Sequence, residues 1–125
     1  MEKSFSERVA EAKAAVPAVS PKEASARKAG DPETLFIDPR NPEDIRATGL
    51  IPGALNVPLK NLSELSDDRL PAELASRSRP IIAACGGGPM GALAAHALQQ
   101  RGFHNVAFID GGTQGWLNAG YATVQ

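Results

Sequence analysis

The side chain best suited to covalent chemistry in this sequence of 125 residues is Cys85, its only cysteine. Cys85 ends an apolar run, "IIAAC", and is followed by three glycines and Pro89. A cysteine thiolate can act as a nucleophile and carry a transferred group as a covalent intermediate. A lone cysteine can equally be an inert, buried hydrophobic residue. The elements that hold Cys85 decide between these two roles.

The residues on either side of Cys85 predict a strand, a loop and a helix. Residues 80–84 form a short apolar run, which is typical of a buried strand. Residues 91–102 are rich in helix formers, and Gly102 is expected to end the helix. Cys85 would then lie at the carboxyl end of a strand, where open α/β sheets bind ligands. The amino end of the following helix offers unpaired N–H groups, and the glycines can turn further amides inward. This arrangement favours a thiolate or a persulfide at Cys85.

Further apolar runs predict core strands at residues 34–38 and 105–110 and a short strand at 55–57. Helical patterns precede and separate these strands, and Ser20 and Glu23 are expected to form a capping box at the start of one of them. Strands that are apolar throughout and alternate with helices indicate a largely parallel sheet covered on both faces, which is an α/β fold. Besides the helix at 91–102, the predicted helices occupy residues 6–16 and 20–30, a turn or two of 41–49, short pieces of 60–80, and 111–120.

The length and composition indicate a single soluble domain. The formal net charge of −1 gives no support to binding of nucleic acid or of an anionic membrane. A single cysteine cannot form an internal disulfide, which favours a reducing compartment, and no signal peptide or run of roughly 20 apolar residues is present. We therefore expect a cytoplasmic protein without nucleic-acid or membrane partners. Residues 1–18 are expected to form an N-terminal helical arm that could support a homodimer. Residues 19–125 are expected to form the α/β domain.

Two long segments resemble the rhodanese family. In "LFIDPRNPEDIRATGLIPGALNVPL" (35–59), an Asp-x-Arg motif after a core strand is followed by Ile-Pro-Gly-Ala-x-Asn. In "IIAACGGGPMGALAAHALQQRGFHNVAFIDGGTQGWLNAGY" (81–121), a cysteine loop, a helix, a Gly-Phe-x-Asn-Val strand and a Gly-Gly-x-x-x-Trp ending follow in the family's order. The resemblance extends over about residues 20–123. It implies a rhodanese-like three-layer fold, in which helices cover both faces of a mostly parallel five-stranded sheet, and sulfurtransferase activity.

The resemblance also implies roles for individual residues. Cys85 matches the family's catalytic cysteine, which takes a sulfane sulfur from a persulfide or thiosulfate donor and passes it to a thiol or another nucleophilic acceptor, small or protein-bound. Arg40 matches a residue at the rim of the site, where it could orient an anionic donor or make a structural contact with Asp38. No cofactor or metal is implied, and His104 has no companion ligand at metal-binding spacing. The predicted cradle for the sulfur consists of Gly86, Gly87, Gly88, Pro89, Met90 and Gly91.

The loop after Cys85 departs from the family pattern at points that bear on the sulfur donor. Met90 stands near the position of the family's loop cation, and Pro89 has no N–H to offer to a bound sulfur. Loss of one such charged contact typically lowers a rate by a factor of roughly 10² to 10³. Thiosulfate is a dianion, so we expect a donor of lower charge, such as a persulfide. The same departures leave open a catalytically degenerate module that binds partners or senses redox state.

A phosphatase is a further alternative for a cysteine in such a loop. Cysteine phosphatases and arsenate reductases of related architecture use an arginine at the end of the loop to bind oxygens of the substrate anion. The segment "CGGGPMG" contains no arginine. We therefore do not expect phosphatase activity, because the anion would lack its bidentate partner.

Overall fold

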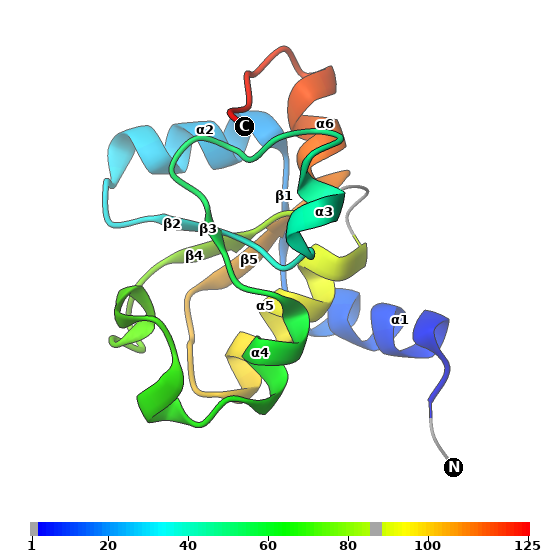
Figure 1. Cartoon of the computed structure of the whole chain (residues 1–125), viewed down its shortest axis with the longest axis vertical. Coiled ribbons are helices and arrows are strands. Elements are labelled where there is room, and N and C mark those ends of the chain that lie inside the picture. Colours follow the sequence, from blue (N-terminus) through cyan, green and yellow to red (C-terminus); the bar gives the residue numbers. More distant parts are fainter. Residues whose placement is uncertain (1–2, 86–88) are drawn as a thin grey trace.

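The computed structural model describes residues 3–85 and 89–125 and contains a five-stranded sheet in which every pairing is parallel (Figure 1). Its strands are β1 (Ala18–Val19), β2 (Leu35–Asp38), β3 (Leu55–Asn56), β4 (Ile81–Ala83) and β5 (Val106–Ile109). Their order across the sheet is β1-β5-β4-β2-β3. The three strands predicted from long apolar runs, β2, β4 and β5, form the centre and are buried throughout. The predicted α/β class and parallel sheet are confirmed.

Helices cover both faces of this sheet. They are α1 (Phe5–Ala15), α2 (Pro21–Gly30), α3 (Pro42–Ile45), α4 (Leu59–Glu64), α5 (Pro89–Gln100) and α6 (Gly112–Asn118). Helices α1, α4 and α5 lie on one face, and α2 and α6 lie on the other (Figure 1). Residues 60–80, where short helices are expected, hold α4 and two 3-10 turns, Asp67–Arg69 and Ala72–Leu74. None of the helices in the described ranges is long and apolar enough to cross a membrane.

Alternate residues of the central strands point to opposite faces of the sheet and belong to two separate hydrophobic cores. In β2, Leu35 and Ile37 belong to the core beneath α5, whereas Phe36 belongs to the core beneath α2 and α6. Trp116 of α6 packs edge-on against Phe36, with the ring centroids 5.7 Å apart. The indole N–H donates to the Ala122 carbonyl oxygen at 2.9 Å. Trp116 is therefore a core residue that holds α6 on the sheet.

Helix α2 begins at the residue that its sequence predicts. The Ser20 hydroxyl caps α2 by accepting a hydrogen bond from the Glu23 amide at 3.0 Å. The Glu23 carboxylate, however, pairs with Arg27 at 2.7 Å rather than with the Ser20 amide. The prediction of a complete capping box is therefore wrong. The bond from the Ser20 amide to the Glu23 carboxylate is missing because Arg27, one turn later, competes for that carboxylate.

Helix α1 begins with a complete capping box between Ser4 and Glu7. Hydrogen bonds from the Ser4 backbone and hydroxyl hold the pKa of the Glu7 carboxyl below its ordinary value. A lowered carboxyl pKa means that this cap is intact at neutral pH and weakens as the pH falls through the lowered pKa.

The N-terminal segment packs onto the rest of the fold. Helix α1 lies against α5, and Ala12 of α1 and the C-cap residue Val16 belong to the core beneath α5. Strand β1, which the sequence did not predict, pairs with β5 through Ala18 and Val19. The division of the chain at residue 18 stays a prediction, and so does a homodimer. The contacts show that α1 adds to the main core.

The C-terminal residues close over the loop that follows α3. The amide and carbonyl of Leu50 exchange hydrogen bonds with Val124 at 2.7 and 2.8 Å, and the Thr123 hydroxyl donates to the Thr48 carbonyl at 2.6 Å. Between them, Gly49 has a φ of +77°, and a Cβ at this position would lie 2.7 Å from the Val124 carbonyl oxygen. Glycine is therefore required here by both conformation and space.

Substitution of Gly49 by alanine is expected to destabilise the protein more than the same change at Gly53. Both residues have positive φ, +77° and +83°, a conformation that costs a side chain about 1–2 kcal/mol. A Cβ at Gly53 would meet no atom of the described residues within 4 Å, whereas one at Gly49 collides with the Val124 carbonyl. We expect the collision to make the loss in the free energy of unfolding at least about 1 kcal/mol larger for Gly49→Ala than for Gly53→Ala. Urea unfolding measures both losses. Equal losses for the two variants would contradict the role of the C-terminal residues.

Candidate active site

The residues that could do chemistry gather at the carboxyl edge of the sheet. Cys85 follows β4 by two residues and is only 2% exposed. On one side, the Ala84 amide donates to the Ile37 carbonyl of β2 at 2.8 Å. On the other side, the Thr113 amide of α6 donates to the Cys85 carbonyl. The predicted placement of Cys85 at the end of a central strand is confirmed, whereas its role as a nucleophile stays a prediction.

Helix α5 starts close to the end of β4. Pro89 is its first residue, where a missing N–H removes no hydrogen bond within the helix. Gly91 lies tightly against β4, since a Cβ at this position would be 3.3 Å from the Ala83 carbonyl oxygen. Met90 is half-buried. The sulfur-binding role of this loop stays a prediction, and three of its positions lie outside the described residues: Gly86, Gly87 and Gly88.

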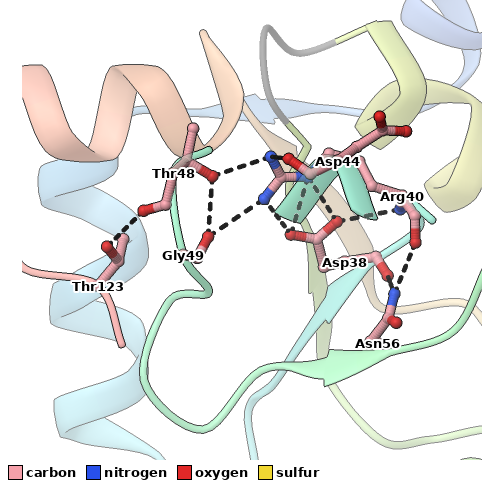
Figure 2. A network of polar contacts seen from close by, with 7 residues as sticks. All are labelled: Asp38, Arg40, Asp44, Thr48, Gly49, Asn56 and Thr123. Carbon is pink, nitrogen blue, oxygen red and sulfur yellow. Dashed lines mark hydrogen bonds and ion pairs between the residues drawn. The ribbon is translucent and has the colours of Figure 1, made fainter. Parts of the chain in front are cut away.

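A buried ion pair occupies the same edge, at the end of β2 (Figure 2). The Arg40 Nη2 lies 2.7 Å from Asp38 Oδ2, and its Nε lies 3.0 and 3.2 Å from the two carboxylate oxygens. The Arg40 amide also donates to Asp38 Oδ1, at 3.0 Å. The two side chains are 6% and 2% exposed. This pair fixes the turn that leads out of β2.

All five guanidinium N–H groups of Arg40 have acceptors within the described residues. Nε and one Nη2 hydrogen bind Asp38, and the second Nη2 hydrogen binds the Gly49 carbonyl at 3.3 Å. Nη1 donates to the Thr48 hydroxyl at 2.9 Å and to the Asp44 carbonyl at 3.4 Å. A guanidinium has five donors, so none is left for a bound anion. The geometry favours the structural contact over donor binding, and a contact of Arg40 with a substrate stays a prediction.

Asn56 of β3 ties this network to the backbone. Its Nδ2 donates to the carbonyl oxygens of Asp38 and Arg40 at 3.0 and 2.7 Å. The hydroxyl of Thr123, near the C-terminus, holds the carbonyl of Thr48 in turn. The network therefore joins the ends of β2 and β3 to the loop after α3 and to the C-terminal residues (Figure 2).

Thr113 is a residue of the site that the sequence did not reveal. It follows Gly111, which caps α6 with a left-handed φ of +78°, and Gly112, the first residue of that helix. The Thr113 amide contacts Cys85, and the Thr113 hydroxyl is fully buried with no hydrogen-bond partner among the described residues. The one signal in the sequence is a hydroxyl residue placed directly after a glycine pair that follows a core strand.

Elsewhere in the described chain, titratable side chains line a groove. A groove of about 470 Å³ between α1, α4 and α5 is lined by Arg8, Glu11 and His96, and Cys85 is not among its described lining residues. Within residues 3–85 and 89–125, no three side chains of His, Cys, Asp or Glu are grouped to hold a metal ion.

A family model of the rhodanese-like domain matches residues 20–119. The match includes the Asp38–Arg40 ion pair, Cys85 and Thr113. The chain belongs to the rhodanese-like domain family. The parallel sheet with a helical layer on each face is thus the fold of a rhodanese-like domain. No curated protein sequence matches this rhodanese-like chain.

Solved structures similar to this rhodanese-like protein include two sulfurtransferases. The polysulfide-sulfur transferase homodimer from Wolinella succinogenes is 26% identical, with a TM-score of 0.74 over 94% of this chain and 85% of that chain. The human single-domain sulfurtransferase TSTD1 is 25% identical, with a TM-score of 0.67 over 82% of this chain and 96% of that chain. The rhodanese-like protein therefore has a fold of the sulfurtransferase family.

A third solved structure bears on the phosphatase alternative. A protein of unknown function from Rhodopseudomonas palustris CGA009, described as a possible tyrosine phosphatase, has a TM-score of 0.85 over 100% of this chain and 96% of its own. At 23% identity, this likeness shows the fold alone. The rhodanese-like chain has no arginine between Cys85 and Gly91, so a phosphate at Cys85 would lack a bidentate partner within this loop.

Proposed function

We propose that this rhodanese-like protein is a sulfurtransferase that moves a sulfane sulfur through a persulfide on Cys85 to a thiol acceptor. The observation that carries the proposal is the position of Cys85. The only cysteine lies at the carboxyl edge of the sheet, between the ends of β2 and β5 and before α5. Two solved structures with this fold, at 25% and 26% identity, are sulfurtransferases by name, which supports the same activity here.

In the first step, the Cys85 thiolate attacks the outer sulfur of a hydropersulfide donor, R–S–SH. A new bond joins the Cys85 Sγ to that sulfur, the S–S bond of the donor breaks, and R–S⁻ leaves with the electron pair of the broken bond. The outer sulfur keeps its proton or releases it to solvent. The product is a persulfide on Cys85, and no external oxidant or reductant is consumed.

In the second step, the thiolate of the acceptor attacks the outer sulfur of the Cys85 persulfide. The S–S bond of the persulfide breaks, the Cys85 thiolate is regenerated, and the acceptor leaves as a persulfide. Hydrogen bonds of the Ala84 amide to β2 and of the Thr113 amide to the Cys85 carbonyl fix the backbone on which this sulfur would be carried.

The charges around Cys85 favour a donor of low negative charge. Residues 85–91 contain no Lys or Arg, and all five N–H groups of Arg40 bind protein acceptors. Exposed acidic side chains follow the two neighbouring strands, Asp110 after β5 and Glu43 and Asp44 after β2. Thiosulfate would bring two negative charges on the reacting group itself, whereas the persulfide group of a donor carries at most one. A small or protein-bound persulfide is therefore the donor that fits best. The protein would encounter this donor in a reducing compartment such as the cytoplasm.

An arginine at position 90 is expected to improve thiosulfate as a donor. A charged partner for a developing anion is typically worth about 2–4 kcal/mol, so Met90→Arg should raise kcat/KM with thiosulfate at least about tenfold. Met90→Leu, similar in size and uncharged, is the matched control and should leave the rates with thiosulfate and with glutathione persulfide unchanged. A wild-type protein that already uses thiosulfate as fast as glutathione persulfide would contradict the donor preference.

Turnover tests the proposed function. With glutathione persulfide as donor and dithiothreitol as acceptor, the protein should accelerate sulfur transfer in proportion to its concentration. Absence of acceleration would favour the alternative, a module that binds a partner or senses redox state. That alternative draws its support from Pro89, which has no N–H, and from Met90, which has no charge.

A further inference from the structure

The Thr113 hydroxyl is a buried polar group whose partner is not accounted for by the fold. Thr113 is 0% exposed, and its Oγ1 has no hydrogen-bond partner among the described residues. Buried hydroxyls are nearly always paired, because an unpaired one loses its hydrogen bonds to water without replacement. Thr34, also buried and at the opposite end of the sheet, directs its hydroxyl to the Arg27 carbonyl at 3.5 Å. The hydroxyl of Thr113 therefore requires a separate explanation.

The position of Thr113 points to Cys85. The Thr113 amide donates a hydrogen bond to the Cys85 carbonyl, so the two residues are in direct contact. Oγ1 is three covalent bonds from that amide nitrogen, and bond lengths near 1.5 Å keep it within about 4 Å of the nitrogen. The hydroxyl and the thiol thus belong to one small region at the carboxyl edge of the sheet.

Loading of Cys85 would bring a new acceptor into this region. A persulfide places its outer sulfur about 2 Å beyond Sγ, because an S–S bond is about 2.05 Å long. The outer sulfur carries negative charge when ionised, and a threonine hydroxyl can donate one hydrogen bond to it. Because Cys85 is only 2% exposed, few water molecules can serve that sulfur, and a protein donor matters more.

We propose that the Thr113 hydroxyl donates a hydrogen bond to the outer sulfur of the Cys85 persulfide. This assignment rests on the proposed function and names a residue that stabilises its covalent intermediate. In the reduced protein the hydroxyl has no acceptor among the described residues, whereas in the loaded protein both the hydroxyl and the sulfur gain a partner. Thr113 therefore shifts the loading equilibrium toward the persulfide without taking part in the making or breaking of bonds.

The equilibrium constant for loading measures this contact. Reduced protein is equilibrated with glutathione persulfide and glutathione at fixed ratios, and the loaded fraction is read from the intact mass. A hydrogen bond to a charged group typically corresponds to a factor of about ten or more, so Thr113→Val should lower the loading constant about tenfold. Thr113→Ser keeps the hydroxyl and should stay within about threefold of the wild type. Thr34→Val, the matched removal of a buried hydroxyl far from Cys85, should leave the constant unchanged.

The melting temperature of the reduced proteins separates this role from a structural one. Because Oγ1 is unpaired among the described residues, Thr113→Val should melt no lower than the wild type in the reduced state. Thr113→Ala provides the same comparison if valine does not fit. A parallel loss of melting temperature and of loading would show a structural role and overturn the assignment.

The failure of this assignment can be told apart from the failure of the proposed function. A folded Thr113→Val protein that loads with the wild-type equilibrium constant overturns the assignment and leaves the proposed function standing. A wild-type protein that takes up no sulfur overturns both.

Discussion

Replacement of Cys85 by serine is expected to reduce sulfur transfer to the uncatalysed rate. A serine hydroxyl is not ionised near neutral pH and does not exchange sulfur with a persulfide, so the variant loses the carrier altogether. Cys85 is the only cysteine, and no second thiol can take its place. The measurement is the rate of sulfur transfer from glutathione persulfide to dithiothreitol, at equal concentrations of wild-type and variant protein.

A control for folding accompanies this prediction because Cys85 is only 2% exposed. Burial of a hydroxyl without a partner costs about 1–3 kcal/mol, so the melting temperature must show that Cys85→Ser is folded at the assay temperature. Cys85→Ala, which buries no polar group, is the second variant. Transfer well above the uncatalysed rate by either folded variant would contradict the role of Cys85.

Asp38→Ala is expected to destabilise the protein by about 3–5 kcal/mol. The substitution leaves the Arg40 guanidinium, 6% exposed, without its counter-ion and without the acceptors of Nε and of one Nη2 hydrogen. Domains of this size have a total stability of about 5–15 kcal/mol, so a large share of it would be lost. Urea unfolding followed by the fluorescence of Trp116, the only tryptophan and a buried one, measures the change.

Two comparisons make this prediction specific to a buried pair. Glu23→Gln breaks the ion pair of Glu23 with Arg27, two side chains that are 50% and 44% exposed, respectively. It should change the free energy of unfolding by about 0.5 kcal/mol or less. The double variant Asp38→Asn/Arg40→Met leaves no uncompensated charge and should recover part of the loss. A change of less than about 1 kcal/mol for Asp38→Ala would contradict a structural role for the pair.

Much of the fold follows from local patterns in the sequence. Strands β2, β4 and β5 are apolar throughout, and only a sheet buried on both faces accommodates such strands. Ser20 and Gly102 mark helix boundaries because a side-chain cap and a left-handed glycine act within a few residues. The place of Cys85 follows from the order of strand, glycines and helix, which fixes it at the carboxyl edge.

Features that depend on distant parts of the chain could not be predicted. Arg40 binds the Thr48 hydroxyl and the Gly49 carbonyl, which belong to a loop held by the C-terminal residues. Strand β1 is two residues long, too short for any pattern of apolar residues. The contact of Thr113 with Cys85 requires β5 to lie beside β4, and this strand order is set by the packing of the whole sheet.

The intact mass of the reduced protein after exposure to glutathione persulfide, and separately to thiosulfate, tests most directly whether Cys85 carries sulfur. We predict that the wild-type protein gains the mass of one sulfur atom from glutathione persulfide, that Cys85→Ser gains none, and that thiosulfate loads a much smaller fraction. No gain from either donor, or a gain that persists in Cys85→Ser, would contradict sulfur transfer through Cys85.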